Sequence, residues 1–213
     1  MVGLVIHNFA SAAVGIAIAA ALVRGIARHS ARTLGNFWVD LVRTTYYLLV
    51  PVCVVLAVFL VSQGMIQNFK PYTKAKLLEP MKIQVEKKND KGETVKGPDG
   101  KPVMEEQTIT EQVIAQGPVA SQVAIKMLGT NGGGYYNANA AYPFENPTPL
   151  SNFIQMLSIF SIGCGLTYYL GRMVKNQAHG WSIWAAMMAL FLAGVLLCWH
   201  SEAAGNPIHQ QLV

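Results

Sequence analysis

Residues 130–134 read TNGGG and combine a hydroxyl, a side-chain amide and three successive glycines. Glycine reaches backbone conformations that other residues avoid, so Gly132, Gly133 and Gly134 can turn several carbonyl oxygens toward one axis. A ring of carbonyl oxygens can replace the hydration shell of a permeating cation. Thr130 can add its hydroxyl, and Asn131 can add a side-chain carbonyl or brace the loop from behind. The segment is thus a candidate cation path lined by backbone.

Two other interpretations of this segment compete with a cation path. A surface turn is the simplest, because four glycines and three prolines fall within residues 126–149. A phosphate-binding loop requires GxxxxGK[ST] between a strand and a helix, whereas here Lys126 precedes the glycines and no strand pattern is adjacent. No GxGxxG pattern is present either. Nucleotide binding at this loop is therefore disfavoured.

Two charged residues flank the glycines. Lys126 lies in an apolar segment, where a buried ammonium is costly and needs a carboxylate or helix-end carbonyls. Its charge can also tune a neighbouring cation site. Glu145 either draws cations to the outer mouth of the path or braces the turn before Pro147. These alternatives stay open from the sequence.

A short helix is predicted immediately before the glycine loop. Residues 119–128, VASQVAIKML, are compatible with a helix, and Pro118 suits its first turn. At about 1.5 Å per residue the segment reaches roughly halfway through a bilayer core. The negative end of its dipole would point toward the cation path. The order of span, half-helix, glycine loop and span is the plan of a pore loop.

The flanking sequence is that of a membrane protein. The 213 residues are 52% hydrophobic and 13% charged, whereas soluble domains carry about 25% charged residues. A spanning helix needs about 20 mostly apolar residues, which predicts spans at residues 2–23, 41–62, 153–170 and 181–199. We therefore predict an all-α integral membrane protein with about four transmembrane helices, one re-entrant pore helix and a Gly-rich filter loop.

Basic residues predict the orientation of the spans. Those in the short connections are Arg24, Arg28, Arg32, Arg43, Arg172 and Lys175. Short cytoplasmic loops are enriched in Lys and Arg, so both connections are expected to be cytoplasmic and residues 63–152 to lie outside. The N-terminus is then expected outside too, directly at the start of a membrane helix, which suggests a piece of a longer protein.

Charged residues are concentrated in one insert. Residues 70–111 hold nine lysines and eight acidic residues, 17 of the 27 charged groups. We expect a solvated loop in which alternating stretches such as KIQVE can pair as a hairpin. The predicted division is 1–63, two transmembrane helices joined by a basic cytoplasmic loop; 64–117, a polar extracellular or periplasmic loop; 118–149, the pore helix and filter loop; and 150–213, two further transmembrane helices.

The remaining polar residues do not indicate other chemistry. The net charge of +5 does not form a basic stripe interleaved with aromatic residues, which argues against nucleic-acid binding. Cys53, Cys164 and Cys198 each lie alone in an apolar run without metal-ligand spacing. Asp40 and Arg43, three residues apart on a predicted helix, are expected to form a local ion pair.

Long stretches of the sequence are similar to one known family. LGTNGGGYYNANAAYPFENPTPLSNFIQML closely resembles the potassium-binding A subunit (KdpA) of the Kdp-type potassium-transporting P-type ATPases. So do NFASAAVGIAIAAALVRGIAR and TLGNFWVDLVRTTYYLLVPVCVVLAVFLVSQGMIQNF, and GPVASQVAIKMLGTNGGG supplies the link into the filter. The resemblance covers nearly the whole chain except the insert at 70–112, which looks like a variable extracellular loop.

The resemblance implies a potassium-channel-like fold. Members of the family resemble a potassium channel fused four times in one chain, and this sequence looks like the second unit with parts of its neighbours. By the same resemblance, Thr130, Asn131, Gly132 and Gly133 line the site of the transported K⁺, and Gly134 gives the backbone its turn. No covalently bound cofactor is implied.

The resemblance also implies a non-catalytic role and a set of partners. These are a P-type ATPase subunit that hydrolyses ATP, a single-span C subunit and a small F peptide, together in the lipid of a bacterial inner membrane. Potassium enters from outside through the filter and passes sideways toward the ATPase subunit. The subunit itself cleaves no bond.

One filter loop cannot encircle an ion, and the sequence contains no internal repeat. The chain is therefore expected to be a truncated or split product, or else to assemble in four copies. A passive homotetrameric channel and a non-conducting membrane scaffold remain alternatives to a pore element of an ATP-driven uptake complex.

Overall fold

The computed structural model describes residues 2–28, 30, 33–87, 94–95 and 102–205. Arg32 of the predicted basic cluster lies outside these ranges. The chain divides into two compact units, one formed by Met1–Met65 with Ala120–Val213 and the other by Ile66–Val119. The first unit holds the helices and the glycine loop, and the second holds most of the polar insert.

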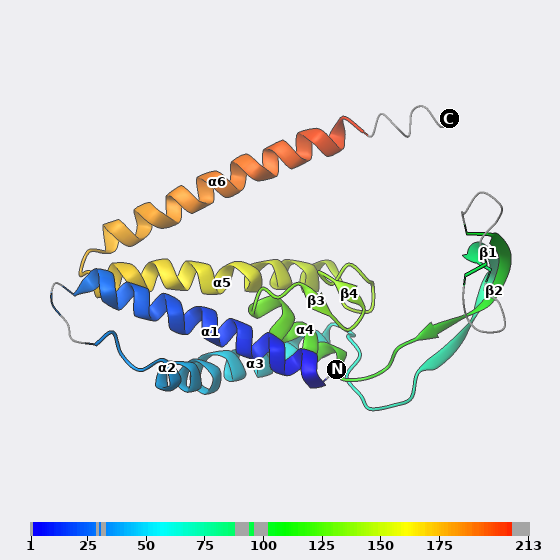
Figure 1. Ribbon diagram of the computed structural model, residues 1–213, viewed down its shortest axis with the longest axis horizontal. Coiled ribbons are helices and arrows are strands. Elements are labelled where there is room, and N and C mark those ends of the chain that lie inside the picture. Colours follow the sequence, from blue (N-terminus) through cyan, green and yellow to red (C-terminus); the bar gives the residue numbers. More distant parts are fainter. Residues whose placement is uncertain (1, 29, 31–32, 88–93, 96–101, 206–213) are drawn as a thin grey trace. The chain divides into compact units, whose positions relative to one another are not determined.

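The first unit is helical, and Figure 1 labels its α-helices and short strands. The elements of this unit are α1 (Val2–Ala27), α2 (Phe37–Arg43), the π-helical turn η1 (Thr44–Leu49), α3 (Val50–Ser62), α4 (Val119–Leu128), α5 (Pro149–Met173) and α6 (Gln177–Ala203), with a small hairpin of β3 (Gly133–Gly134) and β4 (Asn137–Ala138). Four helices are long and apolar enough to cross a membrane: Val2–Ala27, Phe37–Ser62, Pro149–Met173 and Gln177–Ala203. The predicted all-α membrane fold with four spans is confirmed.

Three of these helices begin several residues before the apolar runs that predicted them. Their N-cap residues Asn36, Thr148 and Asn176 each accept a hydrogen bond from a backbone N–H of the first turn. Capping satisfies donors that have no partner within the helix. Polar residues can therefore start a helix whose apolar stretch begins only a turn later.

The second span contains an irregular turn beside Pro51. The π-helical turn η1 ends at Leu49, and the Val50 N–H bonds the carbonyl of Thr45, five residues earlier. Proline lacks an N–H, and its ring clashes with the carbonyl four residues before it. A widened turn relieves this clash without ending the helix. The span is thus continuous from Phe37 to Ser62.

An ion pair joins α1 to α2. Helix α1 lies beside both α5 and α2 (Figure 1). The two terminal nitrogens of Arg24 bond the two carboxylate oxygens of Asp40, Nη2 to Oδ1 at 2.8 Å. The expected pair of Asp40 with Arg43 is wrong, because the guanidinium fork on the neighbouring helix matches the carboxylate in two places.

The second unit is a two-stranded ribbon instead of the expected loop. Strands β1 (Thr73–Glu86) and β2 (Met104–Ile114) pair antiparallel, with a register shift between Lys76 and Met81. The predicted pairing of KIQVE in a hairpin is confirmed, but the ordered strands are much longer. Cross-strand ion pairs such as Lys82–Glu106, at 3.0 Å, contribute to this pairing. Pro80 lies in the irregular segment, where a missing N–H is tolerated.

Candidate ion-binding site

The helix before the glycine loop is short and buried. Helix α4 has the predicted bounds Val119–Leu128, and all its residues except Ser121 are buried. Its ten residues rise about 15 Å, half of a hydrocarbon core about 30 Å thick. By contrast, none of the apolar window of α6 is buried. Helix α4 therefore ends among the longer helices, and irregular backbone begins there.

The end of α4 places Thr130 in a strained conformation. The Thr130 N–H bonds the Met127 carbonyl at 3.2 Å, and the Asn131 N–H bonds the Lys126 carbonyl at 3.0 Å. These two bonds form a Schellman motif, in which glycine usually occupies the left-handed position. Thr130 occupies it here with a φ of 57°. Non-glycine residues in this region cost about 1–2 kcal/mol, and such strain is concentrated at functional sites.

The glycines turn back on themselves in a small hairpin. Gly132 has a φ of 78°, and its carbonyl accepts a hydrogen bond of 2.6 Å from the Asn139 N–H. Strand β3 then pairs with β4. Among the described residues, no donor bonds the carbonyl of Thr130 or Asn131. Of the expected filter carbonyls, these two remain available in this structure, whereas that of Gly132 is engaged.

The Asn131 side chain braces the loop against α1. Its Nδ2 donates to the Ser11 hydroxyl at 2.5 Å. Its Oδ1 is buried and has no hydrogen-bond partner in the described ranges. A Cβ added to Gly129 would lie 2.5 Å from that oxygen and 3.2 Å from Ala12 Cβ. Only glycine at position 129 therefore lets the loop approach α1 this closely.

A buried ion pair lies behind the glycine hairpin. Lys126 Nζ and Glu145 Oε2 are 2.7 Å apart, and both side chains are 0% exposed. The other carboxylate oxygen of Glu145 accepts the Tyr136 N–H at 3.2 Å. The pair thus connects α4 to the residues just after β3. Removal of either charge alone is expected to destabilise the fold strongly, because the other charge would stay buried without its partner.

Two glutamines extend this support. Gln122 Oε1 accepts the Tyr135 N–H at 3.1 Å. Gln155 Nε2 of α5 donates to the Glu145 carbonyl at 2.9 Å. Both glutamines are buried, with 1% and 2% of their surface exposed. Helix α4 therefore holds the tip of the hairpin through Gln122. Helix α5 holds the turn that carries Glu145 through Gln155.

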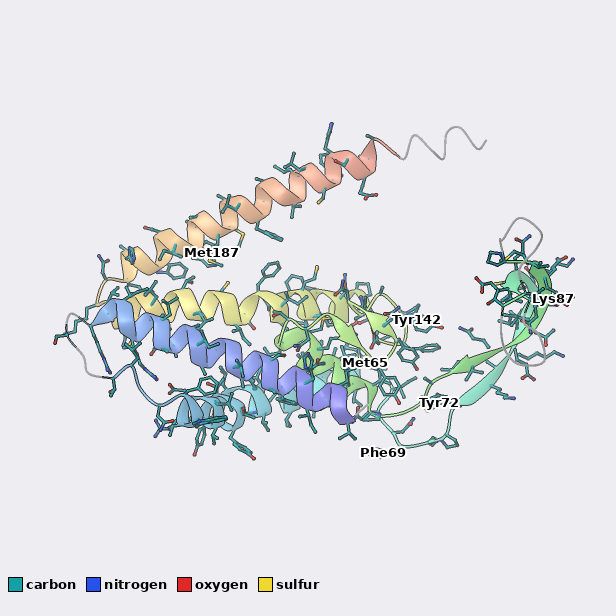
Figure 2. The ribbon with its side chains drawn as sticks, viewed as in Figure 1. Met65, Phe69, Tyr72, Lys87, Tyr142 and Met187 are labelled. Carbon is teal, nitrogen blue, oxygen red and sulfur yellow. The ribbon has the colours of Figure 1, made fainter. Side chains whose placement is uncertain are left out.

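Aromatic rings cover the tip of the hairpin. Tyr136 stacks on Tyr142 with 5.0 Å between ring centroids and 10° between planes, and Phe144 lies 5.9 Å from Tyr136. Figure 2 labels Tyr142 beside the glycine hairpin. Offset stacking of this kind contributes about 0.5–1.5 kcal/mol beyond area burial.

An open groove of about 380 Å³ adjoins the end of α4. Gly129 and Thr130 line it together with Ser11 of α1 and Ile162 of α5. Its other walls are apolar.

The structure brings Lys126 and Glu145 together behind the predicted site residues 130–134. Because Glu145 is fully buried, its position favours bracing over attraction of cations at an outer mouth. Ser11, Gln122 and Gln155 were not among the residues that the sequence patterns predicted. The signal for them was a polar side chain within an otherwise apolar segment. Over the ranges described above, no three or more His, Cys, Asp or Glu side chains come together as a metal site.

Four helices that are long and apolar enough to cross a membrane, together with a buried half-length helix and a glycine loop, identify a multi-pass membrane protein. The family model described as "KdpA: Potassium-transporting ATPase A subunit" matches residues 1–212, and the chain belongs to this family.

Similar proteins carry a consistent name. The chain is 57% identical to a protein of Koribacter versatilis over 98% of its own length, and 54% identical to one of Acidobacterium capsulatum over 98%. It is 51% identical to a protein of Chromobacterium violaceum over 100% of its length. Each is named "Potassium-transporting ATPase potassium-binding subunit". The chain spans about a third of the length of these relatives, covering 33%, 33% and 35% of them.

Proposed function

We propose that residues 130–134 form one loop of a potassium filter in an ATP-driven uptake complex. The observation that carries this proposal is the backbone at the end of α4. Thr130 is strained there, and the carbonyls of Thr130 and Asn131 accept no hydrogen bond from any described residue. Dehydrated K⁺ is coordinated by such oxygens. Membership of a family of potassium-transporting ATPase subunits supports the choice of ion.

The electrostatics around the loop suit a cation. The C-terminal end of α4 carries a partial negative charge of about half an electron. An ammonium at Lys126, so near the loop, would repel K⁺ if it were unpaired. Its ion pair with Glu145 cancels this charge at short range. The site is thus neutral in its side chains and negative in its backbone.

The proposal also includes a direction of transport and a set of partner subunits. Potassium enters from the extracellular side and passes toward a P-type ATPase subunit that hydrolyses ATP, so this chain contributes binding and not catalysis. A single-span C subunit and a small F peptide complete the complex in a bacterial inner membrane. Residues 64–117, including the β1–β2 ribbon, then lie on the extracellular side.

A single loop supplies about a quarter of the oxygens that encircle an ion. The relatives are about three times as long as this chain, and their further length provides room for the other loops. Cross-linking of the purified chain tests the alternative of a passive channel. A discrete tetramer that conducts K⁺ without partners would contradict the proposed complex.

Gly132→Ala tests the filter directly. Gly132 has a φ of 78°, and an added Cβ would lie 3.0 Å from Asn139 Oδ1. Strain of about 1–2 kcal/mol in this loop is expected to weaken apparent potassium affinity about tenfold. The measurement is potassium-stimulated ATPase activity of the full complex as a function of K⁺ concentration.

Gly194→Ala is the matched control, because Gly194 lies within α6 and its added Cβ would meet nothing within 4 Å. We expect this variant to keep the original potassium affinity. An unchanged affinity in Gly132→Ala would contradict the placement of the filter at this loop.

A further inference from the structure

The turn between α5 and α6 forms a polar pocket, far along α5 from the glycine loop. It has a volume of about 420 Å³ and is lined by Tyr168, Gly171, Arg172, Lys175 and Gln177. Helix α5 has 25 residues, which corresponds to about 37 Å. Its last turn therefore reaches the headgroup region if its first turn lies near the other side of a bilayer.

The turn is built around a lysine where glycine is usual. The Lys175 N–H bonds the Arg172 carbonyl at 3.2 Å, and the Asn176 N–H bonds the Gly171 carbonyl at 3.0 Å. This is again a Schellman motif, with Lys175 in the left-handed position at a φ of 57°. Asn176 then caps α6. Glycine at position 175 would adopt this backbone conformation without strain, so the lysine side chain does not stabilise the turn.

Two glycines bring the helices together beneath the pocket. A Cβ on Gly180 would lie 2.7 Å from the Thr167 carbonyl oxygen and 3.1 Å from Gly171 Cα. This close approach lays the Gln177 amide over Gly171, where an added Cβ would be 2.9 Å from Gln177 Oε1. Both polar atoms of that amide are buried without a hydrogen-bond partner among the described residues. A buried amide without partners is unfavourable, so a ligand oxygen that reaches Nε2 would satisfy its donor.

The charge of the pocket selects an anion. In the part of the chain that the structure describes, neither Arg172 nor Lys175 forms an ion pair, and no acidic residue lines the pocket. The N-terminus of α6, a helix of 27 residues, adds a partial positive charge beside Gln177. Arginine, lysine and helix-terminal N–H groups are the usual ligands of phosphate.

We propose that this pocket binds the phosphate of an anionic phospholipid headgroup. Free inorganic phosphate has the same chemistry, but the pocket lies at the junction of two membrane-spanning helices, where lipid phosphate is concentrated. Basic pockets between transmembrane helices bind anionic headgroups in this way. Arg172 and Lys175 supply the charge, and Gln177 can donate to a phosphate oxygen through Nε2.

The test uses the full complex that carries this chain, purified in detergent and titrated with phosphatidylglycerol or phosphatidylcholine. Native mass spectrometry counts the bound lipid. Each basic side chain contributes about fivefold to binding of an anionic headgroup. Arg172→Gln with Lys175→Gly is therefore expected to weaken phosphatidylglycerol binding about 25-fold and to leave phosphatidylcholine binding unchanged.

Two comparisons keep this test independent of folding. Lys175→Gly alone relieves the left-handed strain, so it is expected to keep or raise the thermal unfolding midpoint while weakening phosphatidylglycerol binding about fivefold. Lys74→Gln with Lys82→Gln removes two positive charges from the exposed ribbon. This matched control is expected to bind phosphatidylglycerol as the unchanged protein does.

Inorganic phosphate distinguishes the two sources of the ligand. Added phosphate is expected to displace phosphatidylglycerol only weakly, since the acyl chains also hold the lipid. Phosphate binding at this turn without preference for phosphatidylglycerol over phosphatidylcholine would overturn the lipid assignment. Unchanged phosphatidylglycerol binding in the Arg172→Gln, Lys175→Gly variant would overturn the site itself.

Discussion

Lys126→Met is expected to lower the apparent free energy of unfolding of the full-length subunit by about 3–5 kcal/mol, the usual cost of breaking a buried ion pair on one side. Methionine preserves most of the lysine stem but leaves the Glu145 carboxylate 0% exposed and without its cation. Glu145 also holds the Tyr136 N–H. The glycine hairpin is therefore expected to loosen and potassium affinity to fall. Denaturant titration in detergent micelles measures the stability.

Two further variants show whether the charge or the shape of Lys126 matters. Lys126→Met combined with Glu145→Gln removes both charges and keeps an acceptor for Tyr136, so it is expected to recover about 2 kcal/mol or more. Lys82→Met breaks the exposed pair with Glu106, whose side chains are 70% and 57% exposed. That control is expected to cost less than about 1 kcal/mol. Equal losses in Lys126→Met and Lys82→Met would contradict a buried pair.

Gly134→Ala is expected to destabilise the subunit by about 1–3 kcal/mol, as overpacking of a filled core does. The added Cβ would lie 2.5 Å from both Cδ and Nζ of Lys126. A lysine at the surface would move aside, but this one is enclosed and paired with Glu145. The clash is therefore expected to separate Lys126 from Glu145 and to weaken potassium affinity. The same micelle titration and potassium-stimulated ATPase activity measure both effects.

The neighbouring glycine and a double variant control this prediction. A Cβ on Gly133 would meet nothing within 4 Å, so Gly133→Ala is expected to change stability by less than about 0.5 kcal/mol. In a background of Lys126→Ala with Glu145→Gln, where no long side chain faces position 134, the penalty of Gly134→Ala is expected to disappear. An equal penalty in both backgrounds would show that the clash with Lys126 is not its cause.

Local patterns predicted the helices of this protein well. Four apolar runs predicted the four long helices, because burial of about 20 apolar residues in lipid depends on composition and length. The bounds of α4 also followed from sequence, since Pro118 begins the pattern and the glycines end it. The strands β1 and β2 were recognised only in part, because residues 87–103 separate them and strand pairing is decided by contacts distant in sequence.

The polar contacts were predicted less well. Asp40 was expected to pair with Arg43 on its own helix, but it pairs with Arg24 of α1. Asn131 bonds Ser11, which is 120 residues away. Spacing along a helix identifies the neighbours a residue has on that helix, whereas contacts between helices depend on which faces meet.

The sequence by itself determined that this is a membrane protein with a half-length helix before a glycine loop, and that its residues belong with one family. Hydrophobic length and the conformational freedom of glycine are local properties, so they can be read from consecutive residues. Only the tertiary structure decided that Glu145 lies behind TNGGG in a sealed pair with Lys126, and that Thr130 rather than glycine takes the left-handed position. The ion pair depends on how the chain returns to α4 after the hairpin, because a buried charge is stable only where its partner lies against it.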